Sequence, residues 1–206
     1  MTAGPRIAGV VLAAGAGRRF GGRKQLAELD GTPLLQHAVD AMLLVPAVDP
    51  VVAVLGADAE VIRQAIDFGE ARPVVCEGWG EGMAASLRCG IDAIGDDPDW
   101  VIVTLGDQPR MTAQVIAWVV DEAVAAGDWV AAIRTTYDGE PGHPVALSAW
   151  LLPEVRSLRG DAGARELLGR HPVITVEAGR LYRPGDVDTP EDLEAIRDEA
   201  RAVLRG

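Results

Sequence analysis

The stretch IAGVVLAAGAGRRFGGRKQL, residues 7–26, passes directly from an apolar run into a loop rich in glycine and arginine. The apolar run, 7–13, contains no polar side chain, which is typical of a central parallel strand covered on both faces. Small residues in the loop let a backbone approach a base and a polyphosphate closely; they are Ala13, Ala14, Gly15 and Gly17. Arg18 and Lys24 add positive charge for phosphate oxygens. The stretch therefore predicts a polyphosphate site at the end of a buried first strand.

Two familiar glycine motifs do not fit this loop. Gly15, Gly17 and Gly21 miss the dinucleotide-binding spacing G-x-G-x-x-G by one residue. Lys24 is followed by Gln25 where a P-loop requires Ser or Thr. A strand-to-helix turn with solvated arginines would give part of the same pattern, so the loop alone does not decide the class of nucleotide.

Apolar runs and helical patterns alternate along the rest of the chain. We expect strands at 51–55, 73–76, 100–105, 129–134, 145–147 and 173–177. We expect helices at 33–44, 59–66, 82–94, 112–126, 150–155, 161–168 and 189–204, and a turn at 139–144. This alternation predicts an α/β fold with a mostly parallel sheet flanked by helices. No Pro-, Gly- or Ser-rich linker divides the chain, so we expect a single Rossmann-like domain over 1–206.

Two acidic segments are candidates for a metal site. Asp107 follows the expected strand 100–105, and the carboxyl end of a parallel strand faces the crevice where such sheets bind ligands. Asp186 and Asp188 lie two residues apart in a segment before Thr189-Pro190, and we expect only one of them to face that crevice. Magnesium often takes one or two carboxylates and completes its shell with phosphates and water. The alternative interpretations are that Asp107 only forms a turn and that Asp188 only precedes a helix cap.

Three further segments carry polar groups at positions suited to ligands. Glycines at 78, 80 and 82 lead into a helix that presents Ser86 on its first turn, while Trp79 either covers this loop or has another role. His143 lies in the expected turn, where it contacts an acceptor or is a surface side chain. Asp161 and Arg165 precede or begin a helix whose N-terminus would suit an anion, or they are an ordinary cap and a solvated arginine.

The bulk composition excludes some classes of function. The 206 residues carry a net charge of −12, which disfavours binding to nucleic acid because phosphate neutralisation needs basic surface. The first apolar run is too short to span a bilayer, so we expect no membrane partner. Cys76 and Cys89 form no disulfide framework or zinc pattern, which fits a reducing cytoplasm.

The first loop resembles the signature L-A-A-G-x-G-x-R-x-G-x-x-K of small nucleotidyltransferases similar to molybdenum cofactor guanylyl- and cytidylyltransferases. Phe20 stands where methionine is usual, and Glu77 where asparagine is frequent. The segments G-D-Q-P, G-H-P and G-D-A-G-A-R are similar to the cytidylyltransferase branch. The resemblance implies that Asp107 and Asp188 hold the metal and that Gly82 and Ser86 contact the base.

The same resemblance implies a function. The enzyme would use Mg²⁺ to transfer CMP from CTP to molybdopterin and release pyrophosphate, and the product would pass to a molybdoenzyme. Lys24, Arg18 and Asp107 would be the catalytic residues, and His143, Asp161 and Arg165 would contact the phosphorylated acceptor. Two alternatives remain: a sugar- or alditol-phosphate cytidylyltransferase, and a non-catalytic carrier of the molybdenum cofactor.

Overall fold

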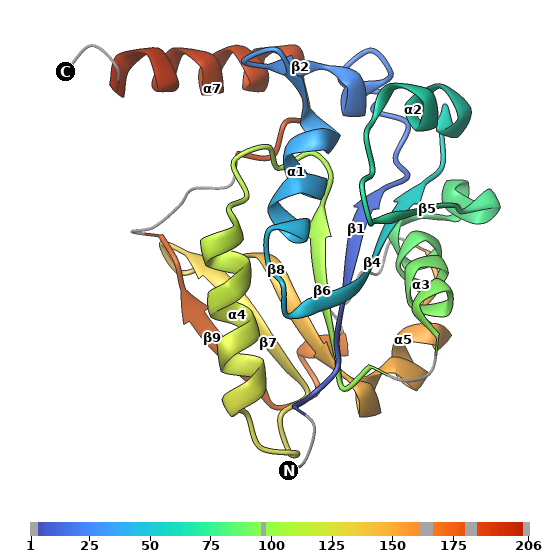
Figure 1. Cartoon of the computed structure of the whole chain (residues 1–206), viewed down its shortest axis with the longest axis vertical. Helices are drawn as coiled ribbons and strands as arrows, with labels where there is room; N and C mark the ends of the chain where they lie inside the picture. The colour runs from blue at the N-terminus through green and yellow to red at the C-terminus, as the bar shows by residue number, and fades with distance from the viewer. Residues whose placement is uncertain (1–3, 96–97, 161–166, 180–184, 204–206) are drawn as a thin grey trace.

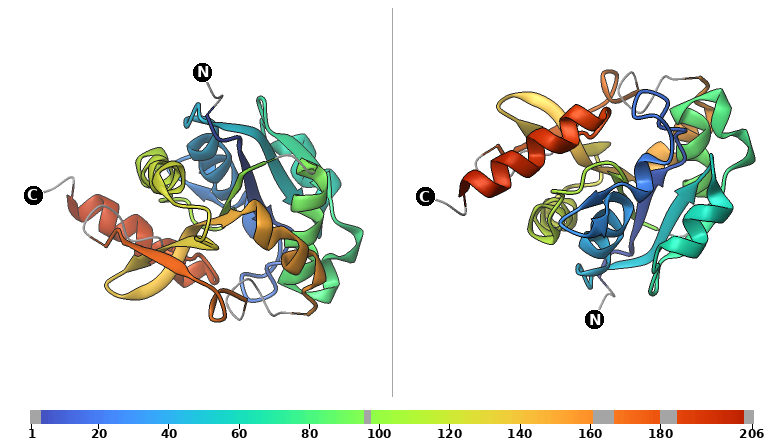
Figure 2. Two further views of the ribbon diagram at one scale, coloured as in Figure 1. Left: turned by 90° about the horizontal axis from the view of Figure 1, so that it is seen from below. Right: turned by 90° about the horizontal axis from the view of Figure 1, so that it is seen from above.

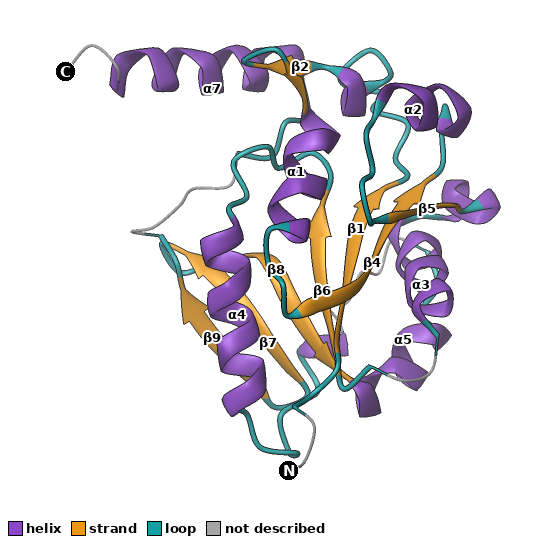
Figure 3. Cartoon of the chain, viewed as in Figure 1, coloured by secondary structure: helices purple, strands orange, loops and turns teal. Residues whose placement is uncertain are grey.

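A computed structural model describes residues 4–95, 98–160, 167–179 and 185–203. In this part of the chain a seven-stranded sheet runs in the order β5-β4-β1-β6-β8-β7-β9 (Figures 1 and 3). In chain order the strands are β1 Ile7–Ala13, β4 Val48–Leu55, β5 Arg72–Val75, β6 Trp100–Leu105, β7 Ala132–Tyr137, β8 Glu140–Ser148 and β9 Val173–Glu177. Only β8 runs antiparallel to its neighbours. The expected α/β fold with a mostly parallel sheet is confirmed.

Helices cover both faces of this sheet. The helices are α1 Leu34–Leu43, α2 Ala59–Ala65, α3 Met83–Ile94, α4 Ala113–Ala125, α5 Leu152–Ser157 and α7 Pro190–Val203. Helices α1 and α4 lie on one face, and α3 and α5 on the other (Figure 2). Short 3₁₀ turns occupy Lys24–Leu26, Glu77–Glu81 and Ala149–Leu151, and a small hairpin joins β2, Glu28–Leu29, to β3, Thr32–Pro33. None of the described helices is long and apolar enough to cross a membrane.

The first strand explains why the opening stretch is apolar throughout. Val11 points into the core beneath α1 and α4, and Val10 points into the core beneath α3 and α5. Both side chains are fully buried. Gly90 lets α3 approach the strand closely, because a Cβ at this position would lie 2.7 Å from Val10 Cγ1. This contact holds α3 against β1 and so fixes the first turn of α3 beside the loop that follows β1.

The hairpin between β7 and β8 corrects two sequence-based predictions. The strand expected at 129–134 lies at Ala132–Tyr137, and the turn expected at 139–144 is wrong because β8 begins at Glu140. The turn consists of Asp138 and Gly139, both with positive φ, 52° and 83°. An Asp-Gly pair is a strong hairpin signal. The prolines at 141 and 144 argue against a strand, but they are tolerated because the pairing of β8 with β6 starts only at Val145.

The remaining predicted elements agree with the structure where it describes them. Thr112 caps α4, with the backbone N–H of Val115 donating to its hydroxyl at 3.4 Å. Most of the helix expected at 161–168 lies outside the described residues. Its last two residues, 167 and 168, are described and are helical.

Candidate active site

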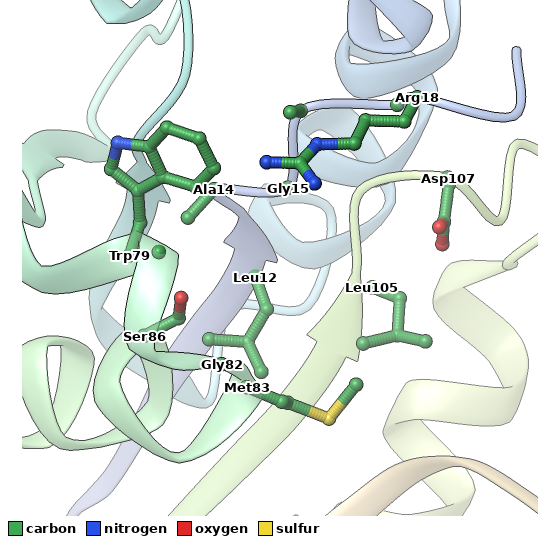
Figure 4. Close-up of a pocket in the computed structure, with 13 residues that line it drawn as sticks. Leu12, Ala14, Gly15, Arg18, Trp79, Gly82, Met83, Ser86, Leu105 and Asp107 are labelled. Carbon is green, nitrogen blue, oxygen red and sulfur yellow. The ribbon is translucent and has the colours of Figure 1, made fainter. Parts of the chain in front are cut away.

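A pocket of about 430 Å³ opens at the carboxyl ends of the adjacent parallel strands β1 and β6. Its lining combines the glycine-rich loop, the 3₁₀ turn 77–81, the first turn of α3 and the end of β6 (Figure 4). The predicted residues in this lining are Ala14, Gly15, Gly17, Arg18, Gly82, Ser86 and Asp107. Ala13 and Lys24 line an adjoining hollow with Gly17 and Asp107. The structure therefore brings the predicted nucleotide-binding residues together at the edge of the sheet expected for them.

Hydrogen bonds from one buried side chain shape the glycine-rich loop. Gln25 Nε2 donates to the carbonyl oxygens of Ala13, at 2.8 Å, and Gly15, at 2.7 Å. Gly17 has φ +59°, and a Cβ there would lie 2.9 Å from Lys24 Cβ. The loop thus folds back on itself so that Lys24 returns to the end of β1. Sequence reasoning missed the role of Gln25, which is buried, with only 5% of its surface exposed.

Lys24 bridges the two aspartates predicted as metal ligands. Its Nζ donates to Asp107 Oδ2 at 2.7 Å and to Asp188 Oδ1 at 3.2 Å. Arg19 forms a second ion pair with Asp188 Oδ2 at 2.9 Å. The Lys24 side chain is only 12% exposed, so these contacts are shielded from water more than a surface ion pair is. Three segments far apart in sequence therefore meet at the ammonium group of Lys24.

Burial and charge act in opposite directions on this cluster. Burial lowers the pKa of Lys24, but the charges and hydrogen bonds of Asp107 and Asp188 outweigh it, and the pKa lies above its ordinary value. Burial raises the pKa of Asp107 and the charge of Lys24 offsets only part of this, while Asp186 and Asp188 raise it further. The site thus concentrates negative charge and keeps the partly buried Lys24 in the protonated form.

The arrangement of the aspartates fits a small divalent cation. Asp107 Oδ1 is buried and has no hydrogen-bond partner among the described residues. Among those residues no group of three or more His, Cys, Asp or Glu side chains forms a metal site. Two carboxylates that already converge on a cation are a set that magnesium or manganese accepts when phosphate and water supply the other oxygens. Asp107 and Asp188 are therefore the residues that fit such a metal.

A capping arrangement fixes Asp188 relative to the sheet. The N–H groups of Asp188 and Thr189 donate to Asp192 Oδ2, and Asp192 N–H donates back to the Thr189 hydroxyl. Val187 N–H donates to the Asp107 carbonyl oxygen at 3.1 Å, which docks this segment beside β6. Asp186 turns the other way and accepts from Gln108 Nε2 at 2.6 Å. Because residues two apart share a face in a regular strand, it is the turn ahead of α7, and not strand alternation, that directs Asp188 toward Lys24 and Asp186 toward Gln108.

The far end of the pocket is less polar. Figure 4 shows Trp79 and Ser86 on the side of the pocket opposite Arg18 and Asp107. Trp79 packs on the backbone after β4, since a Cβ on Gly56 would lie 2.6 Å from Trp79 Cγ. Ser86 is 7% exposed, and no described residue forms a hydrogen bond with its hydroxyl. An aromatic wall and one available hydroxyl suit a flat base with a polar edge.

The predicted acceptor residues are only partly described. His143 lies in β8, partly buried, rather than in a surface turn. Burial lowers its pKa to about 4, against a smaller opposing effect of Asp107, so the imidazole is neutral at physiological pH. Asp161 and Arg165 lie outside the described residues. Gly160, just before them, accepts a hydrogen bond from Ala84 N–H at 3.1 Å at the start of α3.

The lowered pKa of His143 predicts a loss of stability in acid. Above its ordinary pKa of 6.5 the imidazole is neutral in both the folded and the unfolded chain. As the pH falls from 6.5 toward 4, the unfolded chain binds the proton first, which removes about 3 kcal/mol at most from the free energy of unfolding. Thermal midpoints of wild type and His143→Asn between pH 7 and 4.5 measure this. We expect the variant to lose less stability than wild type over this range, and identical curves for the two proteins would contradict the prediction.

Comparisons with known proteins identify the family of this chain. The family described as MobA-like NTP transferase domain matches residues 9–175. A protein named nicotine blue oxidoreductase from Paenarthrobacter nicotinovorans is 34% identical over 205 residues, which are 97% of each chain. The bifunctional enzyme IspD/IspF of Rhizorhabdus wittichii is 34% identical over 183 residues, 87% of this chain and 43% of that enzyme.

A solved structure gives the same result. Rv0371c from Mycobacterium tuberculosis H37Rv has a TM-score of 0.82 at 30% identity, covering 95% of this chain and 100% of that one. The same protein has also been solved in complex with manganese, with a TM-score of 0.78 at 29% identity, covering 94% of this chain and 98% of that one. The chain belongs to the MobA-like NTP transferase family and is a nucleotidyltransferase of that type.

Proposed function

We propose that this protein transfers CMP from CTP to the terminal phosphate of molybdopterin, with magnesium as cofactor, and releases pyrophosphate. The observation that carries the proposal is the convergence of Lys24, Asp107 and Asp188 beside a pocket that has a polyphosphate end and a base end. A phosphate monoester oxygen is already nucleophilic, so the reaction needs positioning and charge neutralisation rather than a covalent intermediate.

Each part of the pocket has a distinct task in this proposal. Arg18 and Lys24 stabilise the charge that develops on the departing pyrophosphate. Asp107 and Asp188 hold the magnesium ion, which when bound neutralises phosphate charge and supports attack at the α-phosphorus. The loop from Ala13 to Gly17 supplies backbone close to the nucleotide. Gly82, Ser86 and Trp79 enclose the base.

The choice of cytosine rests on the L-A-A-G form of the first loop and on the G-D-Q-P segment. We expect pyrophosphate release with CTP to exceed that with GTP, ATP or UTP when molybdopterin and magnesium are supplied. A Ser86→Ala variant should lower the kcat/KM for CTP by about tenfold, because a hydroxyl that bonds the base is lost. Equal or faster turnover with GTP would rule out the cytosine assignment without removing the nucleotidyltransferase one.

A second acceptor class has specific support. The relative IspD/IspF matches most of this chain, which favours testing a sugar- or alditol-phosphate acceptor. Replacing molybdopterin by 2-C-methyl-D-erythritol 4-phosphate in the same assay separates the two acceptors. The carrier alternative is less well supported, because a protein that only transports a cofactor has no need of a lysine bridging two carboxylates beside a polyphosphate loop. A molybdoenzyme that receives the product is part of the proposal for molybdopterin.

A further inference from the structure

We propose that Arg134 on β7, together with His143 on β8, binds the anionic phosphate of the acceptor. This inference rests on the proposed function and names the contact surface of the second substrate. Arg134 was not among the residues that the sequence indicated as functional. The chemical class of the ligand is a phosphate monoester.

The alternation of side chains places Arg134 on the same face of the sheet as the pocket. On β7, Ile133 packs with the core beneath α1 and α4, while Ala132 packs with the core beneath α3 and α5. Arg134 is two residues from Ala132 and therefore projects to the α3 side. On β8, Val145 belongs to the core beneath α3 and α5. His143 lies two residues before it, across an irregularity in the pairing of β8 with β7, and is near enough to Asp107 for that carboxylate to act on its pKa.

The strand register relates Arg134 to β6 through β8. Val145 is paired with Val103 on β6 and with Arg134 on β7. On β6, Leu105 follows Val103 by two residues and lines the pocket. β8 lies between β7 and β6, and neighbouring strands are about 4.8 Å apart. Arg134 therefore lies two strands away from Val103, four residues before Asp107.

The order of the strands separates the two substrates in a way that suits in-line transfer. The glycine-rich loop follows β1, Asp107 follows β6, and β8 and β7 come next on the other side of β6. A nucleotide held by the β1 loop has its triphosphate on one side of Asp107. An acceptor phosphate held by Arg134 and His143 approaches from the opposite side, as an attack at the α-phosphorus opposite the leaving pyrophosphate requires. In this transfer an acceptor oxygen forms the new bond to the α-phosphorus, and the bond from that phosphorus to the pyrophosphate oxygen breaks.

Arg134 also differs from other arginines of the fold. Its Nε is buried without a hydrogen-bond partner, and no described residue forms an ion pair or hydrogen bond with its guanidinium. Arg88 and Arg110, by contrast, pair with Glu81 and Glu199. Buried polar groups in folded proteins are usually satisfied, and a guanidinium matches a phosphate with two parallel hydrogen bonds. A bound phosphate therefore accounts for a cation that the described residues leave unpaired in a chain of net charge −12.

The test measures binding of phenyl phosphate as a probe. Calorimetry is performed on the full chain saturated with magnesium and the non-hydrolysable analogue α,β-methylene-CTP. We expect Arg134→Gln to weaken phenyl phosphate binding by about 10- to 100-fold while leaving the affinity for the analogue unchanged. Arg134→Lys should be intermediate, and it serves as the second variant if the glutamine variant does not fold. Arg170→Gln, which removes the same charge from an exposed site at the opposite end of the sheet, is the matched control.

The outcomes separate this inference from the proposed function. If wild type does not bind the CTP analogue, the proposed function fails. If wild type binds the analogue but not phenyl phosphate, or if Arg134→Gln binds phenyl phosphate as wild type does, the acceptor site at Arg134 is overturned. An equal loss in Arg170→Gln would reduce the effect to net charge and would also overturn it. With molybdopterin as acceptor, the inference predicts a higher KM for molybdopterin and an unchanged KM for CTP.

Discussion

A Lys24→Met protein is expected to release pyrophosphate about 100 to 1,000 times more slowly than wild type, the range found when a preorganised donor to a developing negative charge is removed. Lys24 is the only side chain seen to contact both Asp107 and Asp188 in the described structure. Methionine keeps the apolar length of the side chain and removes the charge. Initial rates at saturating CTP and magnesium measure the loss in kcat.

The stability of the Lys24→Met protein should change much less than its activity. Without Lys24 the pKa of Asp107 rises further, because burial is then opposed by no bonded cation, and the carboxyl group can take up a proton instead of remaining charged. Arg23→Met is the matched control: it removes a charge from the same loop, but Arg23 pairs with Asp58 at 3.6 Å and is 60% exposed. A folded Lys24→Met protein with near-normal turnover would contradict the assignment.

The candidate residues whose place in the fold could be predicted from sequence are those set by local pattern. An apolar run followed by small residues and glycines defines β1 and its loop, and an aspartate directly after β6 has to lie at the same edge of the sheet as that loop. These predictions need only the period of a strand and the direction of parallel strands. The separation of Asp186 from Asp188 does not follow from that period, because residues two apart in a strand share a face; it arises where the segment turns into α7.

The parts that sequence did not predict depend on contacts between distant segments. The role of Gln25 follows from two carbonyl oxygens at 13 and 15 that become its partners only when the loop folds back. Arg134 could not be singled out because its face depends on the exact register of β7, which the apolar pattern places too early in the chain. The Asp138-Gly139 hairpin carries a readable signal, but the prolines of β8 obscure it.

The second large effect concerns Asp107 and Asp188. Each Asp→Asn change is expected to lower turnover by about 100-fold or more, as for the loss of one preorganised charge contact. The double variant should cost little more than the worse single variant, because residues that act as one unit are not additive. The fold should tolerate both changes: asparagine keeps the shape, and the raised pKa of Asp107 means that burial already disfavours its charge. Thermal midpoints of the variants check this.

Asp186→Asn provides the matched control for that experiment. Asp186 lies two residues from Asp188 and carries the same charge, yet it accepts from Gln108 and not from Lys24. We expect its turnover and its dependence on magnesium to stay close to wild type. If the losses of the two single variants simply add in the double variant, Asp107 and Asp188 act independently and do not share a metal ion.

The most direct test of this account is a magnesium titration of pyrophosphate release for wild type, Asp188→Asn and Asp186→Asn at fixed CTP and acceptor. We expect Asp188→Asn to need far more magnesium than wild type and to reach a lower maximum, while Asp186→Asn follows wild type. A titration curve for Asp188→Asn that coincides with wild type, or a shift confined to Asp186→Asn, would contradict the assignment of Asp107 and Asp188 as the joint metal site.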